Sequence, residues 1–331
     1  MKILVTGASG FIGSFVVQEA LDRDFHVWAA VRHSSSREYL GDARINFIEL
    51  DFSDEARLTE QLRPYSFDYV VHAAGVTKSS NVDDFYNINS EGTRRLVAAI
   101  LALGMPLKKF VYLSSLSVYG PIRDSYPHLD ILLSDNPRPN THYGKSKLMA
   151  ENHLRAVRDR LNYTILRPTG VYGPREKDYF MMVKSIKRHA DLSVGFSQQD
   201  ITFVYISALV QAVFLALEQK ASGGKYFITD GEVYTSSDFC ELVSAELGNP
   251  WCTHLTVPVW AMSLACSVGE WWGKSTGRVT ALNRDKFNIL RQRNWRCDVG
   301  AAMTDLGYSP KVKLSEGVKL TIDWYKANGW I

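Results

Sequence analysis

Tyr143 and Lys147, four residues apart, are the side chains in this sequence best suited to move a proton. At helical spacing, residues i and i+4 lie on one face, so the phenol and the ammonium would be neighbours. A tyrosine ordinarily titrates near ~10 and is a poor base at neutral pH, but a nearby ammonium lowers its pKa. We therefore expect Tyr143 to exchange a proton with a hydroxyl or carbonyl group. Because the spacing is common by chance, the alternative is a solvated helix face without chemistry.

Serine hydroxyls precede this pair, at the end of an apolar run over residues 109–114 that predicts a buried strand. A hydroxyl at the C-terminal end of such a strand points into the crevice where open parallel sheets bind ligands. We choose Ser115 as the side chain that hydrogen-bonds the reacting oxygen, with Ser114 and Ser117 as the local alternatives.

Three glycines near the beginning of the chain indicate what this crevice binds. Residues 2–6 predict a strand, and Gly7, Gly10 and Gly13 follow it ahead of an amphipathic helix. Such glycines permit a tight turn, a close approach of the backbone to a pyrophosphate, and close packing of helix on strand. The helix N-terminus then holds the phosphates of a dinucleotide. A glycine turn without a ligand is the alternative, which the strand–helix context disfavours.

Arg32, directly after the second predicted strand at residues 26–31, bears on the type of dinucleotide. NAD sites tend to place an Asp or Glu here for the ribose 2′-hydroxyl, whereas a cation suits the 2′-phosphate of NADP. We therefore expect NADP rather than NAD; the alternative is that Arg32 stacks on the adenine and accepts either cofactor. Further cofactor contacts are expected after the third and fourth predicted strands, at Asp51, Phe52, Ala73, Ala74 and Gly75.

Strand and helix patterns alternate through the first half of the chain. The predicted strands are residues 2–6, 26–31, 45–50, 68–74, 109–114 and 163–167, and later helices are predicted at 56–62, 83–103 and 142–161. This alternation indicates an α/β fold of the Rossmann type, with a doubly wound parallel sheet covered on both faces. We expect a dinucleotide-binding domain at residues 1–173. Residues 174–331 are expected to form a smaller, mainly substrate-binding α/β region, with some segments returning to the first domain.

Composition excludes several classes of protein. The 331 residues carry a net charge of +3, too small to indicate a nucleic acid or an anionic membrane surface as partner. The cysteines have no C-x-x-C spacing, so we expect free thiols in a reducing cytosol and no metal site. These cysteines are Cys240, Cys252, Cys266 and Cys297. The first predicted strand begins at Lys2, so no cleavable leader is expected and the protein is predicted to be cytoplasmic.

The longest apolar run covers residues 257–268 and is followed by Glu270, Trp271 and Trp272. It is shorter than the ~20 residues that cross a bilayer as a helix, so no integral membrane segment is expected. We expect a buried or pocket-lining helix, with Trp260, Trp271 and Trp272 in the core. The alternative is a face that admits an apolar substrate or touches a membrane.

These pieces together resemble the extended short-chain dehydrogenases/reductases, of the broad NAD-dependent epimerase/dehydratase-like group. The matching segments are TGASGFIG at 6–13, HAAG at 72–75, N-x-x-GT at 89–93, the serines ending in VYG at 118–120, Y-x-x-x-K at 143–147 and RPTGVYGP at 167–174. They occur in the family's order and cover roughly the first half of the chain, and looser matches follow at 306–310 and 324–325.

The resemblance implies that Ser115, Tyr143 and Lys147 form the catalytic set and that Asn89 supports the active site. Lys147 would also hydrogen-bond the nicotinamide ribose, and Pro168 would lie against the nicotinamide. In the glycine turn the implied cofactor contacts are Gly7, Ser9, Gly10, Phe11, Ile12 and Gly13. The resemblance also implies a homodimer, joined through the predicted helices 83–103 and 142–161.

Departures from the family pattern narrow the expected reaction. Leu116 and Ser117 stand where sugar dehydratases of the family carry an Asp-Glu pair, so we do not expect elimination of water. The run at 167–170 is closer to reductase and steroid-dehydrogenase-like branches. Ala208 stands where the family often has Asp.

Three functions are compatible with these residues. We expect an NADP- or NAD-dependent oxidoreductase that transfers a hydride at a secondary alcohol or ketone, with a small-molecule substrate. The alternative is a nucleotide-sugar epimerase with retained NAD. A third possibility is a non-enzymatic, cofactor-sensing protein, which the presence of Ser115, Tyr143 and Lys147 disfavours.

Overall fold

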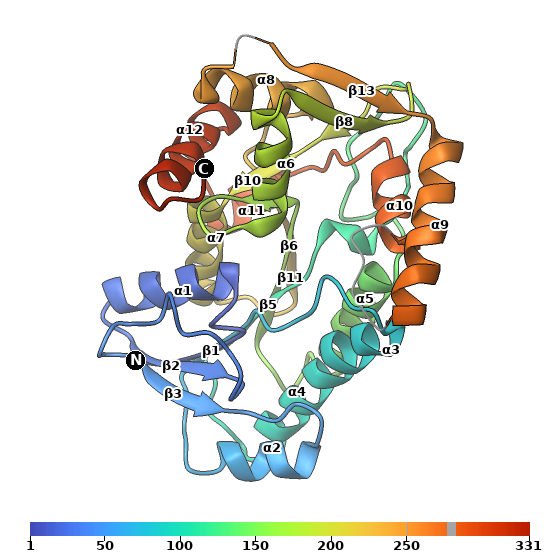
Figure 1. Cartoon of the computed structure of the whole chain (residues 1–331). Coiled ribbons are helices and arrows are strands. Elements are labelled where there is room, and N and C mark those ends of the chain that lie inside the picture. Colours follow the sequence, from blue (N-terminus) through green and yellow to red (C-terminus); the bar gives the residue numbers. More distant parts are fainter. Residues whose placement is uncertain (250, 277–282) are drawn as a thin grey trace.

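A seven-stranded parallel sheet forms the centre of the molecule (Figure 1). The structure, a computed structural model, describes residues 1–249, 251–276 and 283–331. The strands lie in the order β11-β6-β5-β4-β1-β2-β3. Their bounds are β1 Lys2–Thr6, β2 His26–Val31, β3 Asn46–Glu49, β4 Tyr69–His72, β5 Lys109–Leu113, β6 Tyr163–Pro168 and β11 Gly224–Ile228. The order reverses beside β1, so the ligand crevice of such a sheet lies at the carboxyl ends of β1 and β4.

Helices cover both faces of this sheet, because the central strands are apolar on both sides. Ile3 and Val5 of β1 belong to one apolar core, whereas Leu4 between them belongs to the other. Helices α1 Phe11–Asp22 and α7 Ile206–Glu218 pack on the first face. The second face carries α2 Glu55–Leu62, α4 Gly92–Ala102 and α5 His142–Ala156. The predicted doubly wound Rossmann fold is therefore confirmed.

Two predicted helices differ from those observed. The predicted helix at 83–103 is divided into α3 Val82–Asp84, the π-helix η1 Phe85–Glu91 and α4. The wider turn of η1 places Asn89, which is fully buried, against the loop after β4. Such π-turns in helices are frequent at functional sites. The predicted helix at 142–161 ends at Ala156, where the chain passes into turns.

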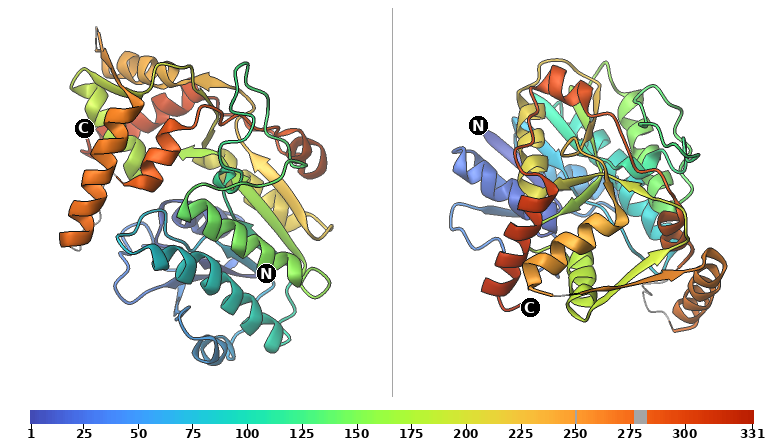
Figure 2. Two further views of the ribbon diagram at one scale, coloured as in Figure 1. Left: turned by 90° about the vertical axis from the view of Figure 1, so that its right-hand side faces the viewer. Right: turned by 90° about the horizontal axis from the view of Figure 1, so that it is seen from above.

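A second group of elements, which we call the outer lobe, lies beyond the carboxyl ends of the strands (Figures 1 and 2). It contains α6 Lys177–Lys187, β8 Ala190–Val194, α8 Ser236–Leu247, β13 Thr253–Val257, α9 Val259–Thr276 and α10 Arg284–Arg291. β8 and β13 pair in parallel, with Asp191 opposite His254. The domain boundary expected after Gly173 stays a prediction. Beyond it, β11 joins the central sheet and α7 packs on that sheet.

Helix α9 is not the buried helix that its apolar sequence predicts. Among its described side chains only Cys266 is buried, while Trp260 is 73% exposed and Trp271 is 67% exposed. α9 packs on α10 and lies at the edge of the molecule in every view (Figure 2), so its outer side meets solvent. The prediction that these tryptophans lie in the core is therefore wrong. In the described part of the chain, no helix is long and apolar enough to cross a membrane.

Candidate active site

The glycine turn after β1 leaves no room for side chains. Gly7 has a φ of +67°, and a Cβ there would lie 2.7 Å from the backbone nitrogen of Ala74. A Cβ on Gly13 would lie 2.1 Å from the carbonyl oxygen of Gly7. Gly10 is the N-cap of α1 and has no capping side chain, so the first backbone N–H groups of the helix can hold a phosphate. The turn therefore fits the pyrophosphate of a dinucleotide, with Ser9, Phe11 and Ile12 half-buried beside it.

The predicted adenosine side of the site is open. Arg32 follows β2 and is exposed. Asp51 follows β3, but its carboxylate accepts hydrogen bonds from the Ser53 hydroxyl at 2.6 Å and from Arg57 at 3.0 Å. The Ser53 contacts lower the pKa of Asp51, so this carboxylate is ionised. Phe52 is half-buried next to it.

The loop after β4 brings small residues against Asn89 and Lys147. A Cβ on Gly75 would lie 2.9 Å from the Asn89 Oδ1 and 3.2 Å from the Lys147 Nζ. Asn89 accepts a hydrogen bond from the backbone of Val76 at 2.8 Å and donates one to the Ser146 hydroxyl at 3.0 Å. Asn89 thus fixes this loop relative to α5. Ala73 and Ala74 lie half-buried between it and the glycine turn.

Ser115 lies next to Tyr143 and lowers the pKa of its phenol. Ser115 is the N-cap of a single 3-10 turn after β5, where its oxygen accepts the Ser117 N–H at 3.1 Å. Burial raises the pKa of Tyr143 to about 12, and Ser115 opposes that rise. Tyr143 therefore keeps its proton at neutral pH and can donate it to an oxygen placed beside Ser115.

Lys147 lies on the same helix but reaches the backbone rather than the phenol. Its Nζ donates to the carbonyl oxygen of Leu113 at 2.8 Å and lies 4.9 Å from the Tyr112 ring centroid. Burial lowers the pKa of Lys147 to about 8, partly opposed by the charge of Glu151. The expected lowering of the Tyr143 pKa by this ammonium does not occur here, because burial is the largest influence on the phenol.

A buried ion pair holds helix α5 against the sheet. Arg167 of β6 and Glu151 of α5 form a bidentate pair at 2.5 and 2.9 Å, and both side chains are almost completely buried. The Ser114 hydroxyl donates to the same carboxylate at 2.6 Å, and Arg167 donates to the Tyr119 hydroxyl at 2.8 Å. Ser114 is therefore engaged in this pair, which leaves Ser115 and Ser117 as the serines near the crevice.

A cavity of about 730 Å³ opens beside Tyr143, a volume typical of small-molecule sites. Its wall includes Ser117 and His142 as well as residues of the outer lobe. The apolar part of the lining includes Val82, Phe85, Met181, Met182, Leu192 and Ile289. The cavity thus lies between the catalytic helix and the outer lobe.

Two residues of α10 belong to this site and escaped the sequence predictions. The Asp285 carboxylate accepts the backbone N–H of His142 at 2.7 Å and that of Tyr143 at 3.3 Å, which satisfies the N-terminus of α5. Lys286 lines the cavity, and burial lowers its pKa. Both lie far along the chain from Tyr143, and their acidic and basic types resemble those of any surface helix. No local pattern could have revealed them.

Three further residues near the crevice, His72, Arg175 and Pro168, pack against or bond to neighbouring parts of the fold. His72 bonds the hydroxyls of Thr6 and Thr93 at 2.7 and 2.9 Å, and burial lowers its pKa to about 3. The Arg175 guanidinium stacks 4.3 Å from the Phe15 ring centroid. Pro168 is buried at the carboxyl end of β6, opposite Ile228.

Comparison with known proteins identifies the family and the relatives that this chain resembles. The sequence profile of the NAD dependent epimerase/dehydratase family matches residues 3–229. The UDP-glucose 4-epimerase of Vibrio cholerae is 27% identical, with 97% of this chain and 94% of that protein covered. The decarboxylating sterol-4-alpha-carboxylate 3-dehydrogenase erg26 of Schizosaccharomyces pombe is 24% identical, with 98% and 97% covered. The UDP-glucuronic acid 4-epimerase of Bacillus cereus, solved with UDP-glucuronic acid and NAD, superposes with a TM-score of 0.76 at 25% identity, with 99% and 100% covered.

The sheet order and the glycine turn define a dinucleotide-binding protein of the Rossmann class. Within that class, the chain belongs to the NAD dependent epimerase/dehydratase family, in agreement with the predicted resemblance, and it is an enzyme.

Proposed function

We propose that this enzyme is an NAD(P)-dependent oxidoreductase that interconverts a secondary alcohol and a ketone. The observation that carries the proposal is the placement of Tyr143, which lines the cavity, next to Ser115 at the end of β5, with β4 between β5 and the strand that precedes the glycine turn. Leu116 and Ser117 follow Ser115, so no carboxylate stands there to expel a hydroxyl group. Hydride transfer without loss of water is therefore the reaction that these side chains support.

The residues of the crevice fit a nicotinamide dinucleotide. The turn at Gly7, Gly10 and Gly13 would hold the pyrophosphate, with Ser9, Phe11 and Ile12 beside it. Ala73, Ala74 and Gly75 leave space above β4, Lys147 would hold the nicotinamide ribose, and Pro168 would lie beside the ring. When bound, this cofactor supplies the hydride acceptor or donor.

Tyr143 and Ser115 handle the proton. In the direction of reduction, the Tyr143 hydroxyl donates its proton to the carbonyl oxygen, and Ser115 donates a hydrogen bond that orients that oxygen. In the direction of oxidation the same step runs in reverse, and Tyr143 must first lose its own proton before it can accept that of the substrate hydroxyl. Asn89 holds the loop at Val76 and, through Ser146, the first turns of α5, so that Tyr143 keeps its place.

The test is an assay of the purified full-length chain with a panel of secondary alcohols and ketones, followed by nicotinamide absorbance. We expect a net change that is stoichiometric with substrate converted. Protein that never changes nicotinamide absorbance, yet isomerises a sugar, contradicts this proposal.

NADP is the cofactor we propose, although the solved relative named above holds NAD. Support comes from Arg32, an exposed cation directly after β2 where a ribose-binding carboxylate would otherwise stand. Replacing Arg32 with Asp is expected to weaken NADPH binding at least tenfold and to improve NADH binding. Arg63→Ala, an exposed cation at the end of α2, is the matched control. Equal affinities of the wild type for both cofactors would indicate that Arg32 stacks on the adenine instead.

A nucleotide-sugar epimerase is the second candidate, favoured by the similarity to the Vibrio cholerae enzyme over almost the whole chain. Epimerisation uses the same proton transfer twice and needs no net cofactor. It predicts NAD that co-purifies with the protein, which native mass spectrometry measures. An empty and readily exchangeable site counts against it.

We also propose a homodimer joined through α4 and α5. A shallow groove between these helices is lined by apolar residues, among them Val97, Leu101 and Val157. Sedimentation at the mass of a single chain would contradict it.

A further inference from the structure

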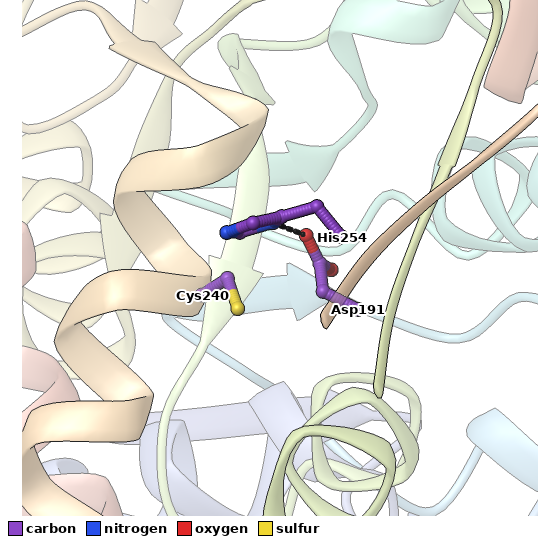
Figure 3. Close-up of side chains that lie close together, drawn as sticks. All are labelled: Asp191, Cys240 and His254. Carbon is purple, nitrogen blue, oxygen red and sulfur yellow. Dashed lines mark hydrogen bonds and ion pairs between the residues drawn. The ribbon is translucent and has the colours of Figure 1, made fainter. Parts of the chain in front are cut away.

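We propose that the outer lobe contains a binding site for a divalent metal ion of the zinc type, formed by Asp191, Cys240, Cys252 and His254. This site is separate from the proposed reaction and does not depend on it. Figure 3 shows three of these side chains, with Asp191 and His254 joined by a hydrogen bond beside Cys240.

The donor atoms already lie close together. One donor atom from each of Asp191, Cys240 and His254 lies within 4.8 Å of the others. The Sγ atoms of Cys240 and Cys252 are 3.3 Å apart, and the His254 Nδ1 is 3.0 Å from an Asp191 oxygen. Tetrahedral Zn²⁺ binds sulfur at about 2.3 Å and nitrogen or oxygen at about 2.0–2.2 Å, so its ligands are about 3.3–3.8 Å apart. Cys252 lies outside the group within 4.8 Å and contacts it through Cys240, so its side chain would have to move to become the fourth ligand.

Three separate elements supply these donors. Cys240 lies on α8, Asp191 lies on β8, and Cys252 and His254 flank the first residue of β13. Residues two apart in an extended segment point to the same side, so Cys252 and His254 face α8 together. The parallel register of β8 with β13 places Asp191 opposite His254. The ligands are therefore joined by packing between elements, which C-x-x-C spacing would not show.

The donors are of the kind that Zn²⁺ selects. Two sulfurs, an imidazole and a carboxylate form a mixed S, N and O set, and four protein ligands are typical of a structural zinc site. His254 has about half of its side chain exposed, which provides an entry path, whereas Cys240 is buried. The exposed side of His254 lets the ion enter, and the buried Cys240 closes the site behind it.

The Asp191 carboxylate brings a negative charge next to Cys240 and His254, which suits a bound cation. Binding of Zn²⁺ would release the protons of Cys240 and Cys252 to solvent, and two sulfur–metal bonds would form without any change of oxidation state. The bound ion, two thiolates and one carboxylate would carry a net charge of −1.

The position suggests what the ion would do. Asp191 and its neighbour Leu192 also line the cavity beside Tyr143. β13 continues through Pro258 into α9, and Glu270 of α9 lines the same cavity. An ion that ties β8 and β13 to α8 would therefore hold the outer wall of the cavity in place. Its role is structural, since all four ligands come from the protein.

The experiment uses the reduced full-length protein, purified without chelator and then titrated with Zn²⁺ in competition with a chromophoric chelator. We expect one zinc per chain by mass spectrometry of the metal content, and a higher melting temperature that a strong chelator reverses. Substitution with Co²⁺ is expected to produce visible absorption bands with thiolate-to-metal charge transfer. These readouts do not involve enzymatic activity.

Cys240→Ser and Cys252→Ser are expected to abolish stoichiometric binding and the charge-transfer band. Cys266→Ser removes a buried cysteine of α9 outside the group and is the matched control, which should bind metal like the wild type. His254→Gln, at a half-exposed position, serves if a buried cysteine variant does not fold. Binding below one tenth of an ion per chain, equal loss in the Cys266 control, or a Cys240–Cys252 disulfide that persists under reducing conditions would each overturn the proposal.

Discussion

The surroundings of helix α5 and of helix α9 in the outer lobe differ in which side chains they bury. Around α5 the charged groups are buried and paired: Arg167 is 1% exposed and Glu151 is fully buried, and together they form two hydrogen bonds. In the outer lobe, the described side chains of α9 leave large apolar surfaces in solvent, and Trp260 is 73% exposed. The region around α5 has a dense interior, whereas α9 contributes only Cys266 among its described side chains to the interior.

This difference indicates which region holds its side chains in fixed positions. The proposed proton transfer needs Tyr143 and Ser115 at a fixed separation, and a buried network provides that rigidity. The outer lobe only has to close the far side of the cavity. The position of this cavity wall can differ from one substrate to another. A metal ion between α8, β8 and β13 would give that wall the support that a small apolar core does not.

The largest effect is expected from breaking the buried ion pair. Glu151→Gln leaves the Arg167 guanidinium buried without its counter-charge, which should lower the free energy of unfolding by about 3–5 kcal/mol. Asp323→Asn breaks the exposed Lys319–Asp323 pair, with expected cost below about 1 kcal/mol. Urea unfolding of both variants measures the contrast. Similar losses in the two would show that burial does not distinguish these regions.

The next largest effect is expected on the reaction rate and not on the stability of the fold. Tyr143→Phe should lower the rate of hydride transfer by about 10²–10⁴-fold, because the proton donor is lost. The midpoint of unfolding should stay close to that of the wild type. Stopped-flow nicotinamide absorbance measures the rate, and cofactor fluorescence checks that binding persists. Tyr126→Phe, at a residue that is 71% exposed, should be silent. An unchanged rate of hydride transfer in Tyr143→Phe would contradict the role of Tyr143 as the proton donor.

Acid should weaken the sheet region through His72. Burial lowers the folded pKa of His72 to about 3 from its ordinary 6.5, so between these values the unfolded chain binds a proton that the folded chain does not. Stability is therefore lost as pH falls from about 6.5 toward 3, by about 2 kcal/mol between pH 7 and pH 5.

His72→Gln should reduce the loss of stability between pH 7 and pH 5 by that amount, measured by urea unfolding at both pH values. His33→Gln, with its side chain 96% exposed, is the control and should behave like the wild type. An unchanged pH dependence in His72→Gln would mean that another group titrates instead.

The smallest effect is expected in the outer lobe. Trp260→Ser should change the free energy of unfolding by less than about 0.5 kcal/mol, because the side chain is already in solvent. Trp330→Ser should cost clearly more, since the Trp330 ring stacks on Tyr325 with 5.3 Å between centroids. A loss above about 1 kcal/mol in Trp260→Ser would show that α9 is covered in solution.

Much of the fold and part of the site could be predicted from local patterns. The strands of the first half lie within about two residues of their predicted ends, because apolar runs between turn residues report a buried strand directly. Ser115, Tyr143 and Lys147 could be placed because each sits at a strand end or on one helix. The π-helix at Asn89 was missed, since its wider turn depends on bonds to the loop at Val76.

The predictions failed where a residue's environment is supplied by distant parts of the chain. The apolar pattern of α9 indicated burial, but no second layer covers the outer side of its described residues. Likewise, the pKa of Tyr143 follows burial under neighbouring elements rather than its spacing from Lys147.

The sequence by itself determined the glycine turn, the alternation of strands and helices, and the family, because these features are encoded by neighbours along the chain. Only the tertiary structure decided that Asp285 satisfies the N-terminus of the catalytic helix and that Asp191 meets Cys240 and His254. Those meetings depend on how β8, β13, α8 and α10 pack. Packing between elements far apart in sequence leaves no periodic signal in the residues that it brings together.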